Sequence, residues 1–484
     1  MTRKVLLGLV ILAVSVLARK VWEPEDVMPL FSGRDIENIC MTETHFWISG
    51  DRYIVQFPCW DSEVGFSQWT SFPFSEKIIT MKCNQESLYV WTKSGCYGRS
   101  DIDFMDTPFQ RVESPPRFAP DIGGCPPRDE NFLMPPGFLY ETGGIIHDLN
   151  LQEFHVTDCA SRNSQKLYMS TDGLGLLEID RRTSVAEQIT FGPCCNESNS
   201  MIVLEDTLIF AGCSYLKNCA LTIYDRENST FEWITGADNY AFPFEGQINC
   251  LAYHGGEIFT GTPYGLSVYA LKGESWLRPT STNSPYIGNI RRMVIQRDTL
   301  YIAASEGIFS YDIATRTVRK ISPNEIIRFN DIASIGGSIY AAGDFGVWKI
   351  ENGEFYRYNT PEGTLVNMVN SVTKGPRNET IFGGRNGILI VDSAGRRQFL
   401  SNTLYLEGKV PNDIVAVSYY LWIATNQGLF LYNRKYRTSQ RMAEERGFPL
   451  YAINRLFLDG EYLWILTDYG AYRFFWNEPD RQGF

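Results

Sequence analysis

Short apolar runs alternate with glycine-containing turns along most of the chain. In YLWIATNQGLFLY, from Tyr420, about five mostly apolar positions precede a polar-polar-glycine turn, and about five more follow it. Runs of this kind indicate strands, and the turn indicates that each pair of runs is a hairpin. Because the runs are apolar on both faces, we expect each hairpin to lie in a sheet packed between two others.

The hairpins recur with a fixed period. The clearest copies align on six glycines spaced by 42, 39, 41, 41 and 42 residues, namely Gly265, Gly307, Gly346, Gly387, Gly428 and Gly470. A period near 40 indicates a supersecondary unit repeated many times. We expect these structural turn glycines to adopt a positive φ, which other residues adopt only with strain.

Apolar segments on either side of each hairpin add two more strands to the unit. DIVAVSY precedes the hairpin at Tyr420, and EFYRYN follows the one that begins at Ser338. Four-stranded units at this period are the blades of a β-propeller, and the lack of a sustained 3.6-residue period excludes a helical solenoid. Weaker copies begin at His45, Ser87, Phe138, Lys166 and Thr207, which brings the hairpins to 11. The sequence therefore predicts an all-β propeller of about 11 four-stranded repeats of about 41 residues.

Eleven blades exceed the four to eight that usually close one ring, so two rings are favoured over a single large one. We expect Cys- and Pro-bearing N-terminal propeller repeats over residues 19–160 and C-terminal propeller repeats over residues 161–484, with the boundary between 155 and 240. The last copy lacks a good fourth strand. The early segment VWEPEDVMPLF is predicted to supply it and so to remove a sheet edge.

The segments LWIATNQGLFLYN and LWILTDYGAYRFF resemble the two-component regulator propeller repeat, whose core reads roughly Leu-Trp-Ile-Gly-Thr-x-x-Gly-Leu. The resemblance covers most of residues 36–476, closely in the second half and loosely in the first. Such repeats occur in extracytoplasmic sensor regions fused to kinases and in stand-alone exported proteins. The sequence has no internal membrane helix, and no kinase segment follows the repeats. The resemblance therefore implies the fold and an exported setting, and it does not imply a signalling output.

The first residues read as a targeting segment. Arg3 and Lys4 precede an apolar run of 14 residues, Val5 to Ala18, which ends in a small-residue cleavage pattern at Val16 and Ala18. We predict a signal peptide over residues 1–18, with an uncleaved anchor or a buried strand as the alternative. The expected location is secreted, or periplasmic or cell-surface in a bacterium. No other stretch approaches the length that a membrane span needs, so we expect no transmembrane segment in the mature chain.

The composition and motifs disfavour several classes of partner and of catalytic site. The formal net charge of −12 disfavours nucleic acid as a partner, and only four histidines occur, His45, His147, His155 and His254. C-x-x-C, G-x-S-x-G and EF-hand spacings are missing from the sequence. We therefore assign no catalytic residue, no metal ligand and no cofactor, and we interpret each histidine as structural.

All 11 cysteines lie between Cys40 and Cys250, and an exported setting permits disulfides. Cys213 and Cys219 flank a short insertion and form one candidate pair. Two further candidates are Cys83 with Cys96, which lie in neighbouring strand-like segments, and Cys40 with Cys59, which are spaced similarly. Buried reduced cysteine is the alternative for each of them.

Three sequons begin at Asn196, Asn228 and Asn378 and are candidate N-glycosylation sites in an organism that glycosylates. Two function classes remain. The first is a non-enzymatic binding or scaffold protein that recognises a protein or carbohydrate through loops at a propeller face. The second is a secreted glycan-active hydrolase or lyase with carboxylates in the propeller channel. A channel mouth where two or three Asp, Glu, Tyr or His side chains converge would indicate the second class, and we favour the first.

Overall fold

The computed structural model describes Trp22 and residues 26–477, apart from 61–62, 102–107, 119–124, 126–130, 142, 150, 162–163, 213–218, 236–246, 278, 280–284, 324–326, 362–364, 366–367 and 445–446. The described residues form ten antiparallel sheets, together with two short helices, η2 (Leu271–Gly273) and α3 (Asn402–Tyr405). The fold is a β-propeller architecture, as the repeat period predicts.

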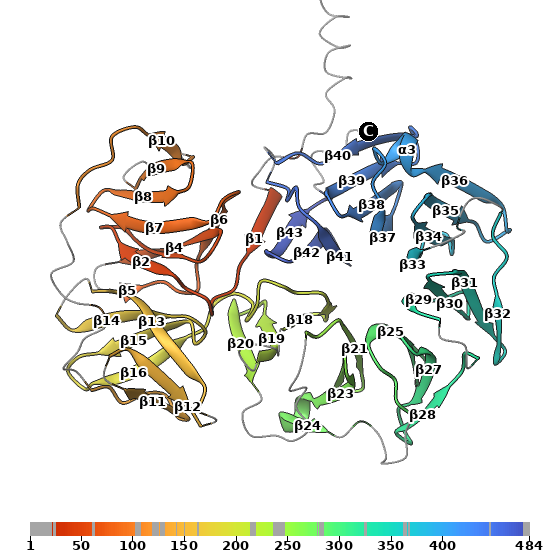
Figure 1. Ribbon diagram of the computed structural model, residues 1–484, viewed down its shortest axis with the longest axis horizontal. Helices are drawn as coiled ribbons and strands as arrows, with labels where there is room; N and C mark the ends of the chain where they lie inside the picture. The colour runs from red at the N-terminus through yellow and green to blue at the C-terminus, as the bar shows by residue number, and fades with distance from the viewer. Residues whose placement is uncertain are drawn as a thin grey trace, which may run out of the picture.

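Seven sheets are arranged around a common centre, which Figure 1 views end-on from green to blue. We call them the ring. Their strands are β17 (Met201–Val203), β18 (Thr207–Ala211), β19 (Cys219–Asp225) and β20 (Thr230–Thr235); β21 (Cys250–His254), β22 (Glu257–Thr262), β23 (Gly265–Ala270) and β24 (Ser275–Leu277); β25 (Ile290–Gln296), β26 (Thr299–Ala304), β27 (Gly307–Asp312) and β28 (Thr317–Lys320); β29 (Phe329–Ile335), β30 (Ser338–Gly343), β31 (Gly346–Glu351) and β32 (Glu354–Arg357); β33 (Val369–Lys374), β34 (Thr380–Gly384), β35 (Gly387–Val391) and β36 (Arg397–Ser401); β37 (Pro411–Val417), β38 (Tyr420–Thr425), β39 (Gly428–Asn433) and β40 (Thr438–Arg441); and β41 (Ile453–Asp459), β42 (Tyr462–Thr467) and β43 (Gly470–Phe475) with β1 (Val27–Leu30).

The N-terminal strand closes the last sheet of the ring. β1 pairs antiparallel with β43, from Val27 opposite Phe474 to Leu30 opposite Ala471. Leu30 is buried beside Phe210 and Trp464, so the strand also packs between the first and last sheets. This confirms that the segment around VWEPEDVMPLF provides the missing outer strand.

The sheets of the ring pack face to face through their apolar runs. Between the β33 and β37 sheets, for example, Ile381 and Ile390 of one meet Ile414 and Leu421 of the other, and all four are buried. Fully burying one such side chain contributes about 1.5–3 kcal/mol. The apolar runs are therefore covered on both faces, as their pattern requires.

The other three sheets form a column beside the ring, coloured red to yellow in Figure 1. Their strands are β2 (Asn38–Met41), β3 (His45–Ser49), β4 (Tyr53–Trp60), β5 (Glu63–Val64) and β6 (Thr70–Pro73); β7 (Ile78–Cys83), β8 (Ser87–Thr92), β9 (Gly95–Ser100) and β10 (Gln110–Val112); and β11 (Phe138–Glu141), β12 (Ile145–Asp148), β13 (Glu153–Ala160), β14 (Lys166–Thr171), β15 (Leu176–Asp180) and β16 (Val185–Ile189). The β2 sheet lies between the other two, since β2 contacts both β7 and β13.

One expected repeat is not a sheet of its own. The hairpin that begins at Phe138 forms β11 and β12, and β12 pairs with β13 to extend that sheet to six strands. The described residues thus contain ten sheets rather than 11. The physical reason is that a lone hairpin cannot bury its apolar face, so it adds to the exposed edge of the next strand instead.

Two crossing segments connect the column with the ring. Phe31–Arg34 leads from β1 to β2, residues 190–198 lead from β16 to β17, and the Gly33 amide donates to the Pro193 carbonyl at 3.2 Å. A Cβ at Gly33 would lie 1.9 Å from the Phe191 carbonyl oxygen, so only glycine permits this crossing. The position 160/161 lies between β13 and β14 of one sheet, and we propose that the two parts divide at residues 190–198 instead.

Candidate functional site

The innermost strands of the ring have a polar residue close to their first residue, at the axis. In β25, β29, β33, β37 and β41 the pairing register skips one residue, which leaves Arg291, Asn330, Asn370, Asn412 and Asn454 as bulges. A bulge bends its strand and redirects the side chain. Asn249, directly before β21, and Asn199, two residues before β17, line the same pocket.

These side chains tie neighbouring sheets together. Four of the asparagines donate from the side-chain amide to a backbone carbonyl at the start of the next sheet, at distances of 2.8–3.1 Å: Asn249 to Ile290, Asn330 to Val369, Asn370 to Pro411, and Asn412 to Ile453. Asn454 donates to the Asn199 side-chain oxygen at 3.0 Å, which joins the last sheet to the first. Each such bond contributes about 0.5–1.5 kcal/mol net, and its loss would leave a carbonyl without its partner.

A pocket of about 370 Å³ opens at this end of the channel, and we call it the mouth. It is lined by amide and guanidinium side chains: Asn199, Asn249, Asn289, Arg291, Asn330, Asn370, Asn412, Asn454 and Arg455. A primary amide has two N–H groups and an acceptor oxygen, so one bond between sheets does not exhaust it. The mouth is thus a recessed surface of neutral hydrogen-bonding groups and two cations.

A buried charge network lies next to the mouth, on the same inner strands. Arg292 is 3.2 Å from Asp331 and 3.8 Å from Asp413, and Arg455 is 4.0 Å from Asp413. Asp331 and Asp413 are only 2% and 4% exposed. These contacts bring together charges from four sheets of the ring.

Backbone amides also donate hydrogen bonds to both carboxylates. Asp413 accepts from the amides of Ile414 and Leu456 at 2.9 and 3.0 Å. Asp331 accepts from the amide of Ile332, the next residue, at 3.0 Å, and from the amide of Val372 in the next sheet at 2.8 Å. Two buried carboxylates held in this way act as structural links between sheets, and they are not presented to a substrate in the mouth.

The two arginines of the network differ in their environment. Burial and then the neighbouring Arg292 lower the pKa of Arg455, and its aspartate partners only partly offset this. For Arg292, burial also acts to lower the pKa, but Asp331 and Asp413 outweigh it and raise the pKa overall. Arg455 is therefore the less well neutralised of the two.

Exposed apolar side chains lie on the same face as the mouth. Since β-strands alternate in direction, the turns between second and third strands return to the end where the inner strands begin. Tyr264, Phe345 and Tyr469 occupy such turns, and Asp468 and Asp344 in the same turns accept from mouth asparagines. We define the apolar rim as the six exposed residues of these turns and of the segments that enter the inner strands: Tyr264, Tyr286, Phe345, Met368, Leu450 and Tyr469.

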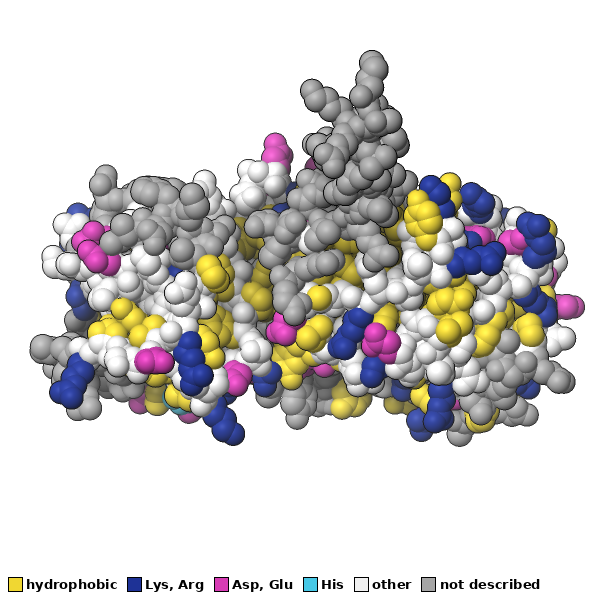
Figure 2. All heavy atoms as spheres, turned by 90° about the horizontal axis from the view of Figure 1, so that it is seen from above, with side chains coloured by type: hydrophobic (Ala, Val, Ile, Leu, Met, Phe, Trp, Pro, Cys, Tyr) yellow, Lys and Arg dark blue, Asp and Glu magenta, His cyan; other side chains and the backbone are white. Residues whose placement is uncertain are grey.

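The outer edge of the molecule has a different character. Figure 2 looks onto this edge and shows basic, acidic and apolar side chains interspersed. Two arginines of the segment Arg434–Arg441 already have partners, since Arg434 pairs with Glu379 and Arg441 donates to the Gln427 carbonyl. The mouth and its rim thus form the more distinctive surface.

The six aligned glycines occupy equivalent turns of the ring. Each directly follows a two-residue turn and begins the third strand of its sheet, with φ between 100° and 142°. At Gly387 a Cβ would lie 2.0 Å from the Leu400 carbonyl oxygen, and at Gly428 it would lie 3.1 Å from the Pro449 carbonyl oxygen. Glycine allows the fourth strand at Gly387, and the segment entering the next sheet at Gly428, to pass close to the turn.

The disulfides differ from the expected pairs. Cys219 bonds to Cys194, and Cys159 bonds to Cys125. Cys213 lies outside the described residues. The Cys194 bond links the segment that follows β16 to β19 of the ring, so the pairing joins parts that are not adjacent in the repeat.

Neither of the other two expected pairs forms. Cys40, Cys83 and Cys96 are free thiols, so the pairs Cys40–Cys59 and Cys83–Cys96 are wrong. The Cys40 thiol instead hydrogen-bonds with Cys83 of the neighbouring sheet, and burial raises its pKa. Sheets packed face to face bring these two residues together, which spacing along the chain does not indicate.

The sequons differ in accessibility. Asn228 and Asn378 are exposed in turns of the ring. Asn196 is partly buried in the connection to the ring, and its side-chain oxygen accepts from the Ser32 amide at 2.7 Å. Attachment of a glycan at Asn196 would break this contact.

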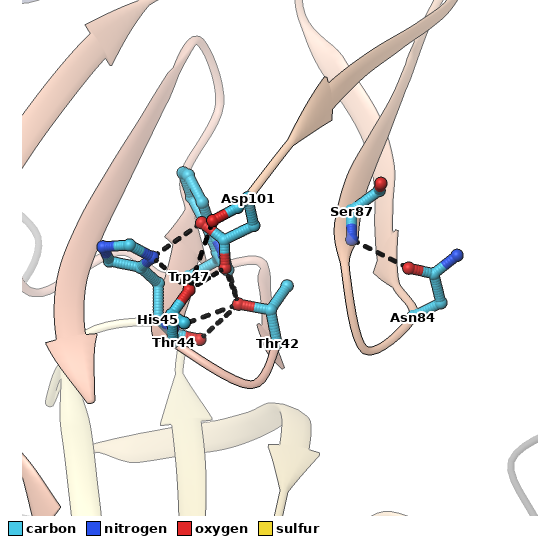
Figure 3. A network of polar contacts seen from close by, with 7 residues as sticks. All are labelled: Thr42, Thr44, His45, Trp47, Asn84, Ser87 and Asp101. Atoms are coloured by element: carbon cyan, nitrogen blue, oxygen red, sulfur yellow. Dashed lines mark hydrogen bonds and ion pairs between the residues drawn. The ribbon is translucent and has the colours of Figure 1, made fainter. Parts of the chain in front are cut away.

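The histidines lie away from the mouth, and each contacts a carboxylate. Figure 3 shows the case with the shortest contact, in which His45 Nδ1 is 2.6 Å from Asp101 and 2.9 Å from the Thr44 hydroxyl. Thr42 and Thr44 also donate to Asp101, which follows β9 of the neighbouring sheet. A catalytic histidine turns one ring nitrogen to the reacting group and the other to an orienting partner, whereas both partners here meet the same nitrogen. The cluster therefore joins two sheets.

His147 lies 2.9 Å from Glu141 on a neighbouring strand, and His155 and His254 are each 3.4 Å from an exposed aspartate. Within the described ranges, no group of three or more His, Cys, Asp or Glu side chains is arranged to hold a metal ion. In the same part of the chain, no helix has the length and apolar character of a membrane span.

The sequence contains a signal for the mouth that the glycine alignment overlooks. The motifs FNDI, VNSV, PNDI and INRL place Asn330, Asn370, Asn412 and Asn454 at spacings of 40, 42 and 42 residues. A polar residue that recurs with the repeat period, directly before an apolar strand, indicates one structural position in successive units.

No family model matches the chain, and no curated protein matches it. Among solved structures, it is similar to the extracellular domain of the putative hybrid two-component system BT4673 from B. thetaiotaomicron, with 13% identity and a TM-score of 0.49 over 93% of this chain and 60% of that one. It thus spans about three fifths of the length of that protein.

Two further structures illustrate the range of similarity. Virginiamycin B lyase from Staphylococcus aureus has 11% identity and a TM-score of 0.46 over 57% of this chain and 94% of that one. PorZ, a surface component of the type-IX secretion system of Porphyromonas gingivalis, has 10% identity and a TM-score of 0.38 over 93% and 87%.

Proposed function

We propose that this chain is an exported, non-enzymatic binding protein that takes up a saccharide in the mouth of the ring. The observation that carries the proposal is the recessed mouth itself, lined by asparagines and two arginines and surrounded by the apolar rim. Its volume of about 370 Å³ lies within the range of pockets for small ligands.

Export is supported by two kinds of observation. Residues 1–18 have the pattern of a signal peptide, although they lie outside the described residues. The disulfides Cys125–Cys159 and Cys194–Cys219 are typical of an oxidising compartment. Both fit a secreted protein, or a periplasmic or surface protein in a bacterium.

Binding is favoured over catalysis by the chemistry of the mouth. Its lining residues are amides and guanidinium groups, neither of which serves readily as a general acid or base at neutral pH. Of the nearby carboxylates, Asp331 and Asp413 are buried and already accept from backbone amides and arginines, and Asp344 and Asp468 in the rim turns accept from mouth asparagines. A hydrolase or lyase that relies on channel carboxylates would need them open to the substrate.

A saccharide suits the mouth better than a folded protein does. Amide groups donate and accept hydrogen bonds, as hydroxyl groups do, and a recessed pocket holds a small chain end rather than a flat surface. The exposed rings of Tyr286 and Phe345 add broad apolar contact beside these polar groups.

The experiment measures binding of a panel of neutral and acidic oligosaccharides by calorimetry. The variants Tyr286→Ala and Phe345→Ala remove exposed rim side chains and should leave folding unchanged. A lost aromatic contact of about 0.5–1.5 kcal/mol corresponds to affinity about 2- to 12-fold weaker. Tyr436→Ala is the matched control, since Tyr436 is similarly exposed but lies in a turn between third and fourth strands, at the opposite end of the sheets. Binding that none of the panel shows, or that Tyr436→Ala weakens as much as the rim variants do, would contradict the proposal.

A further inference from the structure

Two cysteine side chains from different sheets meet within the column. Cys40 lies on β2 and Cys83 on β7, and these two strands contact each other across the interface between their sheets. The two thiols hydrogen-bond, and both pack against one apolar cluster that contains Trp47. Two residues beyond the end of each strand, the Glu43 amide donates to the Gln85 carbonyl at 2.9 Å. The strand ends that hold the two thiols are therefore fixed side by side.

Both thiols are also accessible from solvent. Cys40 and Cys83 are partly exposed, whereas Cys59, Cys96 and Cys250 are buried. An exposed thiol can meet an oxidant, and a second thiol in contact with the first can then complete a bond. This pair combines contact between thiols with access from solvent.

We propose that Cys40 and Cys83 form a disulfide in the exported protein and so join the β2 and β7 sheets. The oxidant is of the disulfide class. One cysteine thiolate attacks it, a mixed disulfide forms as the first thiol leaves, and the other cysteine then displaces the second thiol as the new S–S bond forms. The two cysteines lose two electrons and two protons, and the oxidant is reduced to two thiols.

The bond requires the oxidising setting that the proposed function assumes, but it is independent of what the mouth binds. The disulfides Cys125–Cys159 and Cys194–Cys219 are typical of that setting. Burial, and then the contact with Cys83, raise the pKa of the Cys40 thiol, so little thiolate is present at neutral pH. Exchange in the folded protein is therefore slow. We expect the bond to form as the chain folds and then to persist as a structural link.

The place of the pair in the column gives the bond a physical purpose. The β7 sheet lies at one end of the column, because the β2 sheet lies between the other two (Figure 1). Among the described strands, this end sheet therefore has a neighbouring sheet on one face only. A terminal unit of a stack has fewer contacts and is expected to separate first. A bond between residues 43 positions apart in the sequence would oppose this separation by restricting the unfolded chain.

The test maps the disulfides of the full chain after secretion into an oxidising compartment. The protein is denatured, alkylated without reduction and digested with trypsin. Cleavage places the two residues in separate peptides, Asp35–Arg52 and Cys83–Lys93, neither of which contains another cysteine. We expect mass spectrometry to find these two peptides linked in most molecules, and reduction to release both.

Variants separate this bond from other effects of cysteine loss. In Cys40→Ser the Cys83 peptide should appear alkylated in place of the linked form, and amides of β7 and β8 should exchange hydrogen faster than in the parent. Cys96→Ser is the matched control, since Cys96 is a cysteine of the same sheet, and it should retain the link. If Cys40→Ser does not fold, the map of the parent chain still decides the question.

The same map distinguishes failure of the inference from failure of the exported setting. If Cys40 and Cys83 are alkylated while the Cys219 peptide is linked to the peptide of Cys194, the inference is overturned and the exported setting stands. A map in which neither pair is linked overturns both. A link from Cys40 or Cys83 to any other cysteine also overturns the inference.

Discussion

Replacing Asp413 by alanine should destabilise the ring by about 3–5 kcal/mol. The carboxylate accepts two backbone N–H groups, from Ile414 in its own sheet and Leu456 in the next, and it lies near two arginines. Breaking a buried ion pair costs about 3–5 kcal/mol, because the remaining charge stays buried. The two unpaired amides, at about 1–3 kcal/mol each, point in the same direction and overlap with that figure.

The assay is chemical denaturation followed by circular dichroism, combined with hydrogen exchange of the amides in β37 and β41. Because a protein of many sheets need not unfold in one step, local exchange shows whether the loss begins at the junction of these two sheets. Asp413→Asn keeps an acceptor oxygen and should lose less stability than Asp413→Ala. Asp298→Ala is the control at a strongly exposed aspartate and should change stability by less than about 0.5 kcal/mol.

The reasoning is refuted if Asp413→Ala lies within 1 kcal/mol of the parent, in the same range as Asp298→Ala. That result would mean that the carboxylate is dispensable as a link between sheets.

Three other changes test separate parts of the structure. Replacing Cys194 and Cys219 by serine should cost about 3–4 kcal/mol by the loop-entropy estimate for a 25-residue separation, and an unchanged denaturation midpoint would contradict the pairing. Gly387→Ala should cost at least about 2 kcal/mol, since its positive φ and the nearby carbonyl both oppose a side chain, and a neutral result in the same assay would refute the turn geometry. Burial acts to raise the pKa of Asp101, but hydrogen bonds from His45, Thr42 and Thr44 outweigh it and lower the pKa, so the stability it adds is present above the unfolded value near 4 and is lost as pH falls through the folded value. The stability difference between the parent and Asp101→Asn should therefore shrink on acidification from pH 5 to pH 2, and a difference that grows would contradict this.

Local signals were sufficient to predict the units of the fold. Strand, turn and strand follow from apolar runs that end at a glycine, and the turn at Gly428 has the positive φ that this pattern requires. The closing strand β1 was predictable because an incomplete last sheet leaves an edge that another segment must cover. These features depend on residues within one repeat or at its ends.

Features that depend on packing between distant segments were harder to predict from the sequence. The Cys194–Cys219 bond joins a connecting segment to a strand of the ring, and its partner choice depends on how the two parts pack. The hairpin at Phe138 has the pattern of a repeat, yet it adds to another sheet because the sheet to which β13 belongs offers it an edge. Spacing along the sequence contains neither piece of information.

The mouth could be predicted in part from the sequence. Asn330, Asn370 and Asn412 recur with the repeat period, but the stronger glycine and tryptophan signal set the alignment. The arginines at the axis lie on β25 and β41 only, so they do not recur in every repeat. Their convergence is a property of the closed ring.

The most direct test of the central claim is a hydrogen-exchange comparison of the full chain with and without the tightest-binding oligosaccharide of the panel at saturating concentration. If the mouth is the binding site, protection should increase in residues 285–292, 327–332 and 451–456, which lead into β25, β29 and β41, and should stay unchanged in the turns of the opposite end, such as 434–437. Protection confined to the column or to the opposite end of the ring, with the mouth segments unaffected, would contradict the account.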